Sequence, residues 1–155
     1  FDVLIDAVGS LNEDIRPKVV VVGNGPERQA LVEKAAQAAV DLHLPGAVSP
    51  SELGNWYRNA RIVAVPSLRE GFGLVAAEAA AAGRAVVASA VGGIPEVVVD
   101  GSSGLLVEPG QVEDLAAALR SVDPQWGKNG PSRVSQLGMG AHGETVSKIC
   151  NKLIQ

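Results

Sequence analysis

Residues 61–89 read RIVAVPSLREGFGLVAAEAAAAGRAVVAS, and this stretch decides the fold class. Its first six residues centre on a short apolar run without polar alternation, which is typical of a strand buried in a parallel sheet. The alanine-rich segment 71–82 follows, and alanine is the best helix former. Gly83 would end that helix, and residues 85–89 form another apolar strand. The stretch therefore predicts a strand, a helix and a second, parallel strand.

The same alternation continues on both sides. Before this stretch we expect a helix that opens the chain, a strand at 18–23, a helix from Pro26, a strand at 43–48 and a brief helix capped by Ser51. The apolar stripe of the helix after Pro26 consists of Leu31, Ala35, Ala39 and Leu42. After it we expect a short helix at 95–98, a strand at 104–107, a helix at 112–122, a loop at 123–132 and an amphipathic helix from Val146 to Ile154.

This sustained alternation predicts an α/β fold, a Rossmann-like doubly wound parallel sheet with helices on both faces. Residues 1–122 would form that domain. Residues 123–155 would pack on the same domain as a loop and a terminal helix.

The composition excludes several classes of protein. With 46% hydrophobic residues among 155, the chain can bury a sizeable core, which excludes intrinsic disorder. A net charge of −4 and an aromatic content of only 3% argue against nucleic acid as a partner. The single cysteine, Cys150, fits a reducing compartment, so we expect a cytoplasmic location. Cysteine and histidine show no metal-site spacing, and we expect neither a metal nor a cofactor.

The residues with the most chemistry follow the strand at 61–66. The loop after a parallel strand lies at the carboxyl edge of the sheet, where the next helix directs its free N–H groups and favours an anion such as phosphate. Gly71 and Gly73 would let the backbone approach that anion closely. Glu70 and Glu78 flank the glycines, and carboxylates there are suited to accept hydrogen bonds from sugar hydroxyls. In isolation, such glutamates are more often a helix cap and a solvated helix residue.

Together these residues resemble the C-terminal donor-binding domain of retaining GT-B glycosyltransferases, in their sucrose-synthase-like and mannosyltransferase-like family. Glu70 and Glu78 match the Glu-x7-Glu motif of that family, with Gly71-Phe72-Gly73-Leu74 inside it. The resemblance extends over residues 1–122. The further matching segments, in order, are Gly23-Asn24-Gly25-Pro26, Pro66-Ser67, Gly83, Val86-Val87-Ala88-Ser89, Gly92-Gly93-Ile94-Pro95-Glu96, Asp100-Gly101, Gly104-Leu105-Leu106-Val107 and Pro109.

The resemblance implies a role for each site residue. Glu70 would act as the catalytic residue and contact hydroxyls of the transferred sugar. The backbone N–H groups of Phe72, Gly73 and Leu74, beside Gly71, would hold sugar and diphosphate oxygens. Glu78 would accept hydrogen bonds from the ribose hydroxyls of the nucleotide.

Other segments would complete the donor site. Gly23 and Gly25 would border the nucleotide pocket, and the main chain near Val48 would lie along the base. The donor would be a nucleotide diphosphate sugar of the UDP, GDP or ADP type, from which a hexose passes to an acceptor hydroxyl with retention. Gly92 and Gly93 either shape the crevice or only form a tight turn.

The resemblance also implies parts that this sequence lacks. Family members carry an Arg and a Lys upstream of the opening helix, a first strand inside the sheet and an N-terminal acceptor-binding domain. The sequence has no Asp-x-Asp site, which agrees with a metal-independent enzyme. We therefore expect the parent protein to be the active glycosyltransferase and the 155-residue chain alone to be inactive. Contact with a membrane stays undecided.

Two other functions remain open at this stage. A nucleotide-sugar 2-epimerase also places a nucleotide at the edge of a Rossmann-like domain, although Gly-Phe-Gly-Leu within Glu-x7-Glu favours the transferase. The chain is alternatively a nucleotide-binding fragment without catalytic activity. The Gly-x-Gly after Val22 does not indicate a dinucleotide site, because Arg28 stands at the third glycine position.

Overall fold

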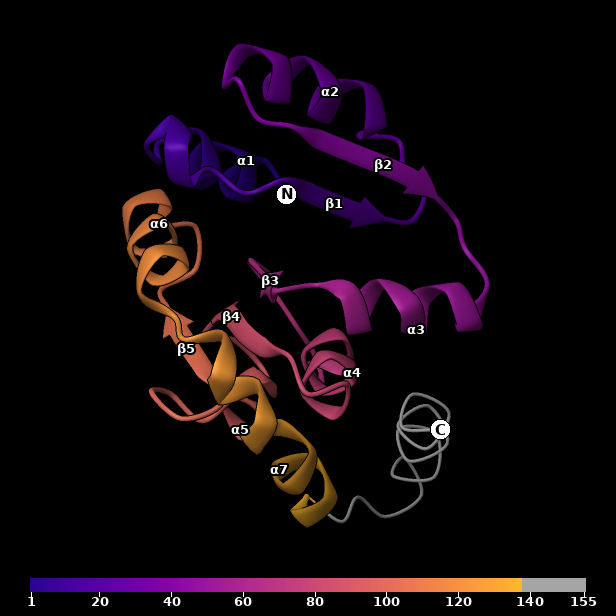
Figure 1. Ribbon diagram of the computed structural model, residues 1–155, viewed down its shortest axis with the longest axis vertical. Coiled ribbons are helices and arrows are strands. Elements are labelled where there is room, and N and C mark those ends of the chain that lie inside the picture. The colour runs from indigo at the N-terminus through magenta and orange to yellow at the C-terminus, as the bar shows by residue number, and fades with distance from the viewer. Residues whose placement is uncertain (138–155) are drawn as a thin grey trace.

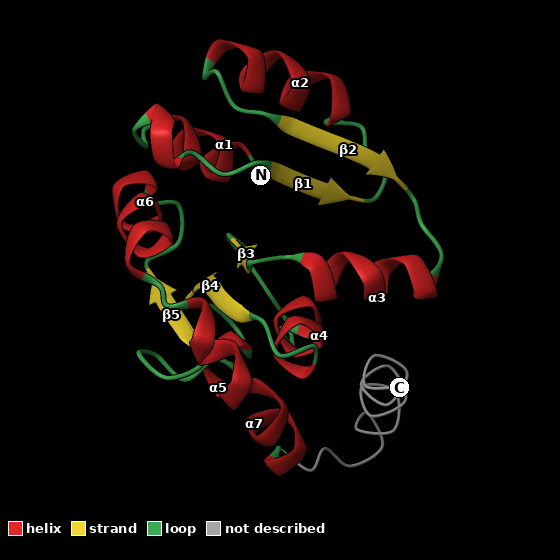
Figure 2. Cartoon of the chain, in the orientation of Figure 1, coloured by secondary structure: helices red, strands yellow, loops and turns green. Residues whose placement is uncertain are grey.

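Parallel strands alternate with helices in this protein, as a computed structural model that describes residues 1–137 shows (Figure 1; Figure 2). Every strand pairing is parallel, and helices pack against the strands, which confirms the predicted α/β fold. The elements, in chain order, are α1 (Asp2–Gly9), η1 (Glu13–Ile15), β1 (Val19–Val22), α2 (Arg28–Gln37), β2 (Leu42–Gly46), α3 (Pro50–Asn59), β3 (Ile62–Val65), α4 (Leu74–Ala81), β4 (Ala85–Ser89), α5 (Ile94–Val97), β5 (Gly104–Val107), α6 (Val112–Ser121), η2 (Pro124–Asn129) and α7 (Gly130–Gln136).

The strand β4 lies at the centre of the hydrophobic core. All of its residues are buried, and successive side chains point to opposite faces of the sheet. Ala85 and Val87 pack into a hydrophobic cluster with α1, α2 and α6, whereas Val86 and Ala88 pack into a second cluster with α3, α4 and α5. Helices therefore cover both faces of the sheet, as the doubly wound architecture requires.

The sheet consists of two parts. β1 pairs with β2, and β3 pairs with β4, which also pairs with β5; within residues 1–137 no strand joins β1 to β3. Figure 1 shows β3 beyond β1, on the side away from β2. The unbroken apolar run at 19–22 predicts a strand buried on both faces, but this prediction is wrong, since Val20 is 36% exposed. The reason is that β1 has a neighbouring strand on one side only.

Several helices begin at other residues than the sequence predicts. α2 begins at Arg28 and not at Pro26, and α5 begins at Ile94 and not at Pro95. Local geometry explains the starts of α3 and α4. α3 is capped by Ser49 and not by Ser51. The Ser49 hydroxyl accepts from the Glu52 backbone N–H, and the Glu52 carboxylate accepts from the Ser49 N–H, which is a capping box. α4 begins at Leu74 and not at residue 71, because Gly73 has a φ of 72°, a left-handed conformation outside the helical range.

α2 ends before the apolar stripe predicts. Ala39 and Leu42 lie outside the helix, and Leu42 begins β2. The Val40 N–H donates to the Ala35 carbonyl at 2.9 Å, which is the long hydrogen bond of a Schellman motif. Ala39 has a φ of 53°, at the position of this motif that glycine usually occupies.

Residues 124–136 are helical, although the sequence predicts a connecting loop over most of this segment. The Asp123 carboxylate accepts a backbone hydrogen bond at the start of η2, and prolines occupy the first turns of η2 and α7. Gly127 and Gly130 lie so close to the backbone around β4 and α4 that a Cβ on either would overlap it. The glycines thus allow close packing.

Part of the predicted organisation is not tested by this arrangement. The terminal helix expected from residue 146 to residue 154 lies outside the described residues, and the division of the chain at residue 122 stays a prediction. No helix within residues 1–137 is long and apolar enough to cross a membrane.

Replacing Ala39 with glycine should stabilise the protein. A left-handed conformation costs a residue with a Cβ about 1 to 2 kcal/mol, and the greater freedom of glycine in the unfolded chain offsets about half of the gain. We expect Ala39→Gly to raise the free energy of unfolding by about 0.5 to 1 kcal/mol in urea denaturation followed by circular dichroism.

The matched control is Ala36→Gly, at an exposed position inside α2. Glycine within a helix should lower the free energy of unfolding by about 0.5 to 1 kcal/mol. If Ala39→Gly and Ala36→Gly lower the free energy of unfolding equally, Ala39 does not end α2 in the way described.

Candidate functional site

The candidate site is formed by the loop between β3 and α4 together with the first turn of α4. β3 ends at Val65, so the loop lies at the carboxyl edge of the sheet. The backbone N–H groups of Gly73, Leu74 and Val75 have no hydrogen-bond acceptor within residues 1–137. Because the positive end of the helix dipole lies at the same place, these N–H groups can bind an anion.

The loop is held in place by Gly92 and Gly93, which follow β4. The Gly93 N–H donates to the Gly71 carbonyl at 2.8 Å. A Cβ on Gly92 would overlap the Glu70 carbonyl, and a Cβ on Gly93 would lie 2.9 Å from the Phe72 carbonyl oxygen. The sequence left open whether this pair forms only a tight turn or also shapes the crevice. In the structure the pair forms the turn before α5 and also shapes the candidate site.

The two predicted carboxylates lie on this loop and helix, and both are half-buried. The Glu70 carboxylate, at the end of the loop, accepts a hydrogen bond from the Gly71 N–H at 3.0 Å. Glu78 lies five residues after Gly73, which corresponds to about 7.5 Å along the helix axis. The Glu70 carboxylate thus lies in the loop that precedes the free N–H groups, and Glu78 lies more than one helical turn after Gly73.

A residue that the sequence analysis missed contacts Glu78. The Tyr57 hydroxyl, on α3, donates a hydrogen bond to Glu78 Oε2 at 2.8 Å. Tyr57 is only 8% exposed, and burial, together with the charge of Glu78, raises the pKa of the phenol far above its usual value. The hydroxyl therefore keeps its proton and stays a donor. The helical pattern of α3 indicates that Tyr57 is buried, but no local pattern indicates a partner 21 residues away.

Exposed apolar side chains occur in the loop after β3 and in the first turn of α4. Phe72 and Leu68 are each 66% exposed, and Leu74 and Val75 are about half exposed. Large apolar side chains exposed so close together are typical of a binding surface.

The remaining predicted site residues lie at the carboxyl ends of β1 and β2. The Gly23 N–H donates to the Gly46 carbonyl at 2.8 Å, so the loop after β1 lies beside the end of β2. Gly25 faces open space, and Val48 is half-buried in the loop before α3. Within residues 1–137 no hydrogen bond joins these three residues to the loop after β3. The structure thus brings the predicted site together in two separate groups.

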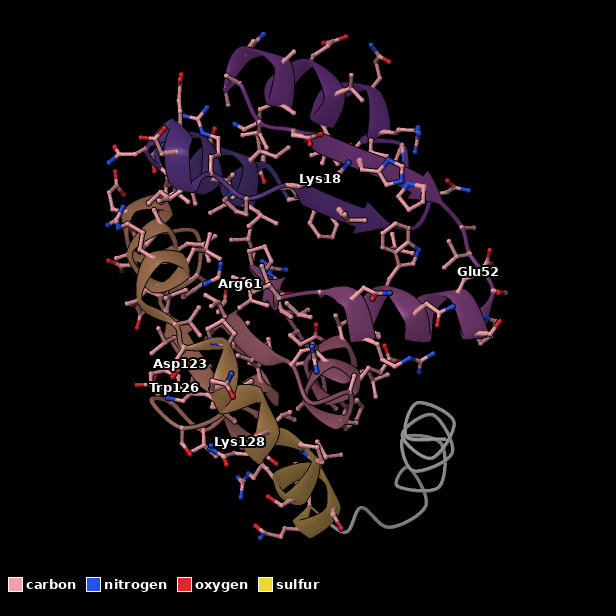
Figure 3. All side chains as sticks on the ribbon, viewed as in Figure 1. Lys18, Glu52, Arg61, Asp123, Trp126 and Lys128 are labelled. Atoms are coloured by element: carbon pink, nitrogen blue, oxygen red, sulfur yellow. The ribbon has the colours of Figure 1, made fainter. Side chains whose placement is uncertain are left out.

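A hollow of about 430 Å³ lies at the opposite, amino-terminal end of the strands. Arg61, Arg84 and Lys128 line it, and Figure 3 labels Arg61 and Lys128. The Arg84 guanidinium donates to the carbonyls of Ala60 and Ala82, at the ends of α3 and α4, at 3.2 to 3.3 Å. Arg84 thus offsets the negative ends of two helices.

Metal ligands do not gather in the described part of the chain. No three His, Cys, Asp or Glu side chains within residues 1–137 lie in a group that could hold a metal ion.

Sequence comparison links the chain to enzymes of known activity. It is 46% identical over 139 residues to a D-inositol 3-phosphate glycosyltransferase of Nocardioides sp. strain JS614, covering 78% of this chain and 30% of the relative. It is 37% identical over 152 residues to the enzyme of the same name from Streptomyces bingchenggensis, covering 90% of this chain and 32% of the relative. The chain therefore spans about a third of the length of these relatives.

Solved structures share the fold. Sucrose-phosphate synthase from Thermosynechococcus elongatus superposes with a TM-score of 0.81 at 31% identity, over 99% of this chain and 42% of that one. The C-terminal domain of LpcC from Francisella tularensis, a group 1 glycosyl transferase, gives a TM-score of 0.75 at 31% identity, over 90% of this chain and 78% of that one. HepE from Anabaena in complex with UDP gives a TM-score of 0.78 at 23% identity, over 98% of this chain and 43% of that one.

The family comparison extends over most of the chain. Residues 1–127 match the family described as glycosyl transferases group 1, and this range includes β1 to β5, Glu70 and Glu78. The chain belongs to the group 1 glycosyl transferases.

Proposed function

We propose that this chain is the donor-binding part of a glycosyltransferase that moves a hexose from a nucleotide diphosphate sugar to an acceptor hydroxyl. The observation that carries the proposal is the set of free N–H groups at the start of α4, flanked by Glu70 and Glu78. Membership of the group 1 family favours this activity over the nucleotide-sugar 2-epimerase and over a fragment without a catalytic parent.

Each part of the donor corresponds to one part of the site. The diphosphate lies on the N–H groups of Gly73 and Leu74, since these donors and the helix dipole favour negative charge. The sugar lies beside Glu70, and the ribose lies beside Glu78. Both carboxylates accept from hydroxyl groups and stay away from the phosphates, which they would repel. HepE, a protein of the same fold, has been solved with UDP and with UDP-glucose, which supports a nucleotide sugar as the ligand.

The proposed reaction does not depend on a side-chain base. Transfer occurs with retention at the anomeric carbon and without a metal ion, and the leaving diphosphate accepts the acceptor proton on the same face. The chain contributes donor positioning, and it stabilises the charge that develops on the diphosphate as the bond to the sugar breaks. Glu70 is the catalytic residue, because it contacts the transferred sugar.

The proposal assigns the acceptor site to a domain outside this chain. The relatives are about three times as long as the matched region, which supports a second domain in the parent protein. A further strand between β1 and β3 belongs to the same proposal, because both strands have an edge without a partner in the described residues. The single cysteine supports a cytoplasmic location for the parent.

A calorimetric titration of the 155-residue chain with UDP, GDP and ADP tests this function. We expect one nucleotide to bind more tightly than the others, and we expect the chain alone to transfer no sugar. A folded chain that binds none of the three would contradict the proposal.

Removing the Glu78 carboxylate should weaken nucleotide binding. The ribose hydroxyls would lose a charged acceptor, and the expected loss for Glu78→Ala is about 1 to 3 kcal/mol of binding free energy in the same titration. Glu113→Ala is the control, since Glu113 is an exposed residue of α6 and should leave the affinity unchanged. An equal affinity of wild type and Glu78→Ala would refute the assigned role.

Replacing Glu70 should weaken binding of the nucleotide sugar but not binding of the nucleotide alone. Because Glu70 contacts the sugar and not the nucleotide, Glu70→Ala should weaken binding of the nucleotide sugar by about 1 to 3 kcal/mol. Its affinity for the free nucleoside diphosphate should change by less than about 0.5 kcal/mol. Calorimetry with both ligands measures the difference, and a loss shared equally by the two ligands would place Glu70 at the diphosphate instead.

A further inference from the structure

Glu78 does not stand alone at the candidate site. Within residues 1–137 its side chain takes part in one hydrogen bond, in which the Tyr57 hydroxyl donates to Oε2 at 2.8 Å. An ionised carboxylate offers about four acceptor positions on its two oxygens. Oε1 therefore has no partner in the described part of the chain and is free to accept from a ligand.

Tyr57 is itself held firmly. The residue is 8% exposed and packs in the hydrophobic cluster that includes Val65, Ala76 and Ile94. A phenol packed in this way has little conformational freedom. Its hydroxyl therefore keeps its position and can hold the Glu78 carboxylate through the hydrogen bond.

The exposure of Glu78 makes this contact important. Its neighbours on the inner face of α4, Ala77 and Ala79, are buried, whereas Glu78 is partly open to solvent. A partly exposed glutamate samples several rotamers, and ordering it on ligand binding costs free energy. A hydrogen bond to one oxygen, made before the ligand arrives, reduces that cost.

We infer that Tyr57 is a positioning residue of the donor site: its hydroxyl holds Glu78 Oε2 so that Oε1 faces the ribose hydroxyls. Tyr57 contacts no part of the donor itself and acts only through Glu78. The inference rests on the proposed function, because it takes the ligand of Glu78 to be the ribose of a nucleotide.

The test compares a ribonucleotide with an analogue that lacks the ribose hydroxyls. The probes are the nucleoside diphosphate, among UDP, GDP and ADP, that binds the wild type most tightly, and its 2′,3′-dideoxy form. We expect Tyr57→Phe to weaken the affinity for the ribonucleotide by about three- to tenfold and to leave the affinity for the dideoxy form unchanged. In a Glu78→Ala background, Tyr57→Phe should have no further effect, because the residue through which it acts is absent.

A merely structural role predicts other results. If Tyr57→Phe weakens the binding of both nucleotides equally, the inference is wrong. It is also wrong if the loss of binding free energy from Tyr57→Phe adds in full to the loss from Glu78→Ala. Asn59→Ala is the control on the same helix, since it removes an exposed side chain that bonds to the Asn55 carbonyl at 2.9 Å, and it should change neither affinity. Wild type that binds neither nucleotide would overturn the proposed function, whereas a wild type that binds both equally would overturn the ribose contact.

A second measurement needs no variant. Tyr57 is the only tyrosine of the chain, so ¹³C-tyrosine labelling gives one Cζ signal in an NMR spectrum. That signal should shift when the ribonucleotide binds and stay in place with the dideoxy form. The same shift with both nucleotides would contradict a role through the ribose contact.

Discussion

The burial of β4 on both faces is the constraint on which the rest of the structure depends. Its alternate side chains, such as Val86 and Val87, enter two different hydrophobic clusters, so helices must cover both sides of the sheet. The helices that follow β3 and β4 then begin at the same edge. Loops with chemically useful residues gather there because the strands are parallel, whatever ligand they bind.

Two glycines shape the candidate anion site at that edge. Gly73 leaves the helical range and exposes the first N–H groups of α4, and Gly93 holds the preceding loop through the Gly71 carbonyl. Neither glycine leaves room for a Cβ without displacing a neighbour. A Cβ on Gly73 would lie 3.1 Å from Ile94 Cγ1, and a Cβ on Gly93 would lie 2.9 Å from the Phe72 carbonyl oxygen. The site is thus shaped by backbone, and in our proposal Glu70 and Glu78 add the carboxylates that distinguish hydroxyls from phosphates.

Much of this arrangement is predictable from the sequence, because apolar runs of four or five residues and the glycines between them are local signals. The strands at 62–65, 85–89 and 104–107 match their predictions for that reason. Features that depend on distant parts of the chain are not predictable in this way. The glycines after residue 123 allow close packing on the backbone around β4 and α4, and the prolines there lie in the first turns of helices and not in a loop. The Tyr57 contact with Glu78 joins two helices through a hydrogen bond that no spacing reveals.

We propose that the first turn of α4 binds the diphosphate of a nucleotide, and NMR titration of the ¹⁵N-labelled chain with the nucleoside diphosphate that binds can test this. We expect the largest amide shifts at Gly71, Gly73, Leu74 and Val75, with smaller ones at Gly23. Shifts that centre instead on Arg61, Arg84 and Lys128, around the hollow at the other end of the strands, would contradict it.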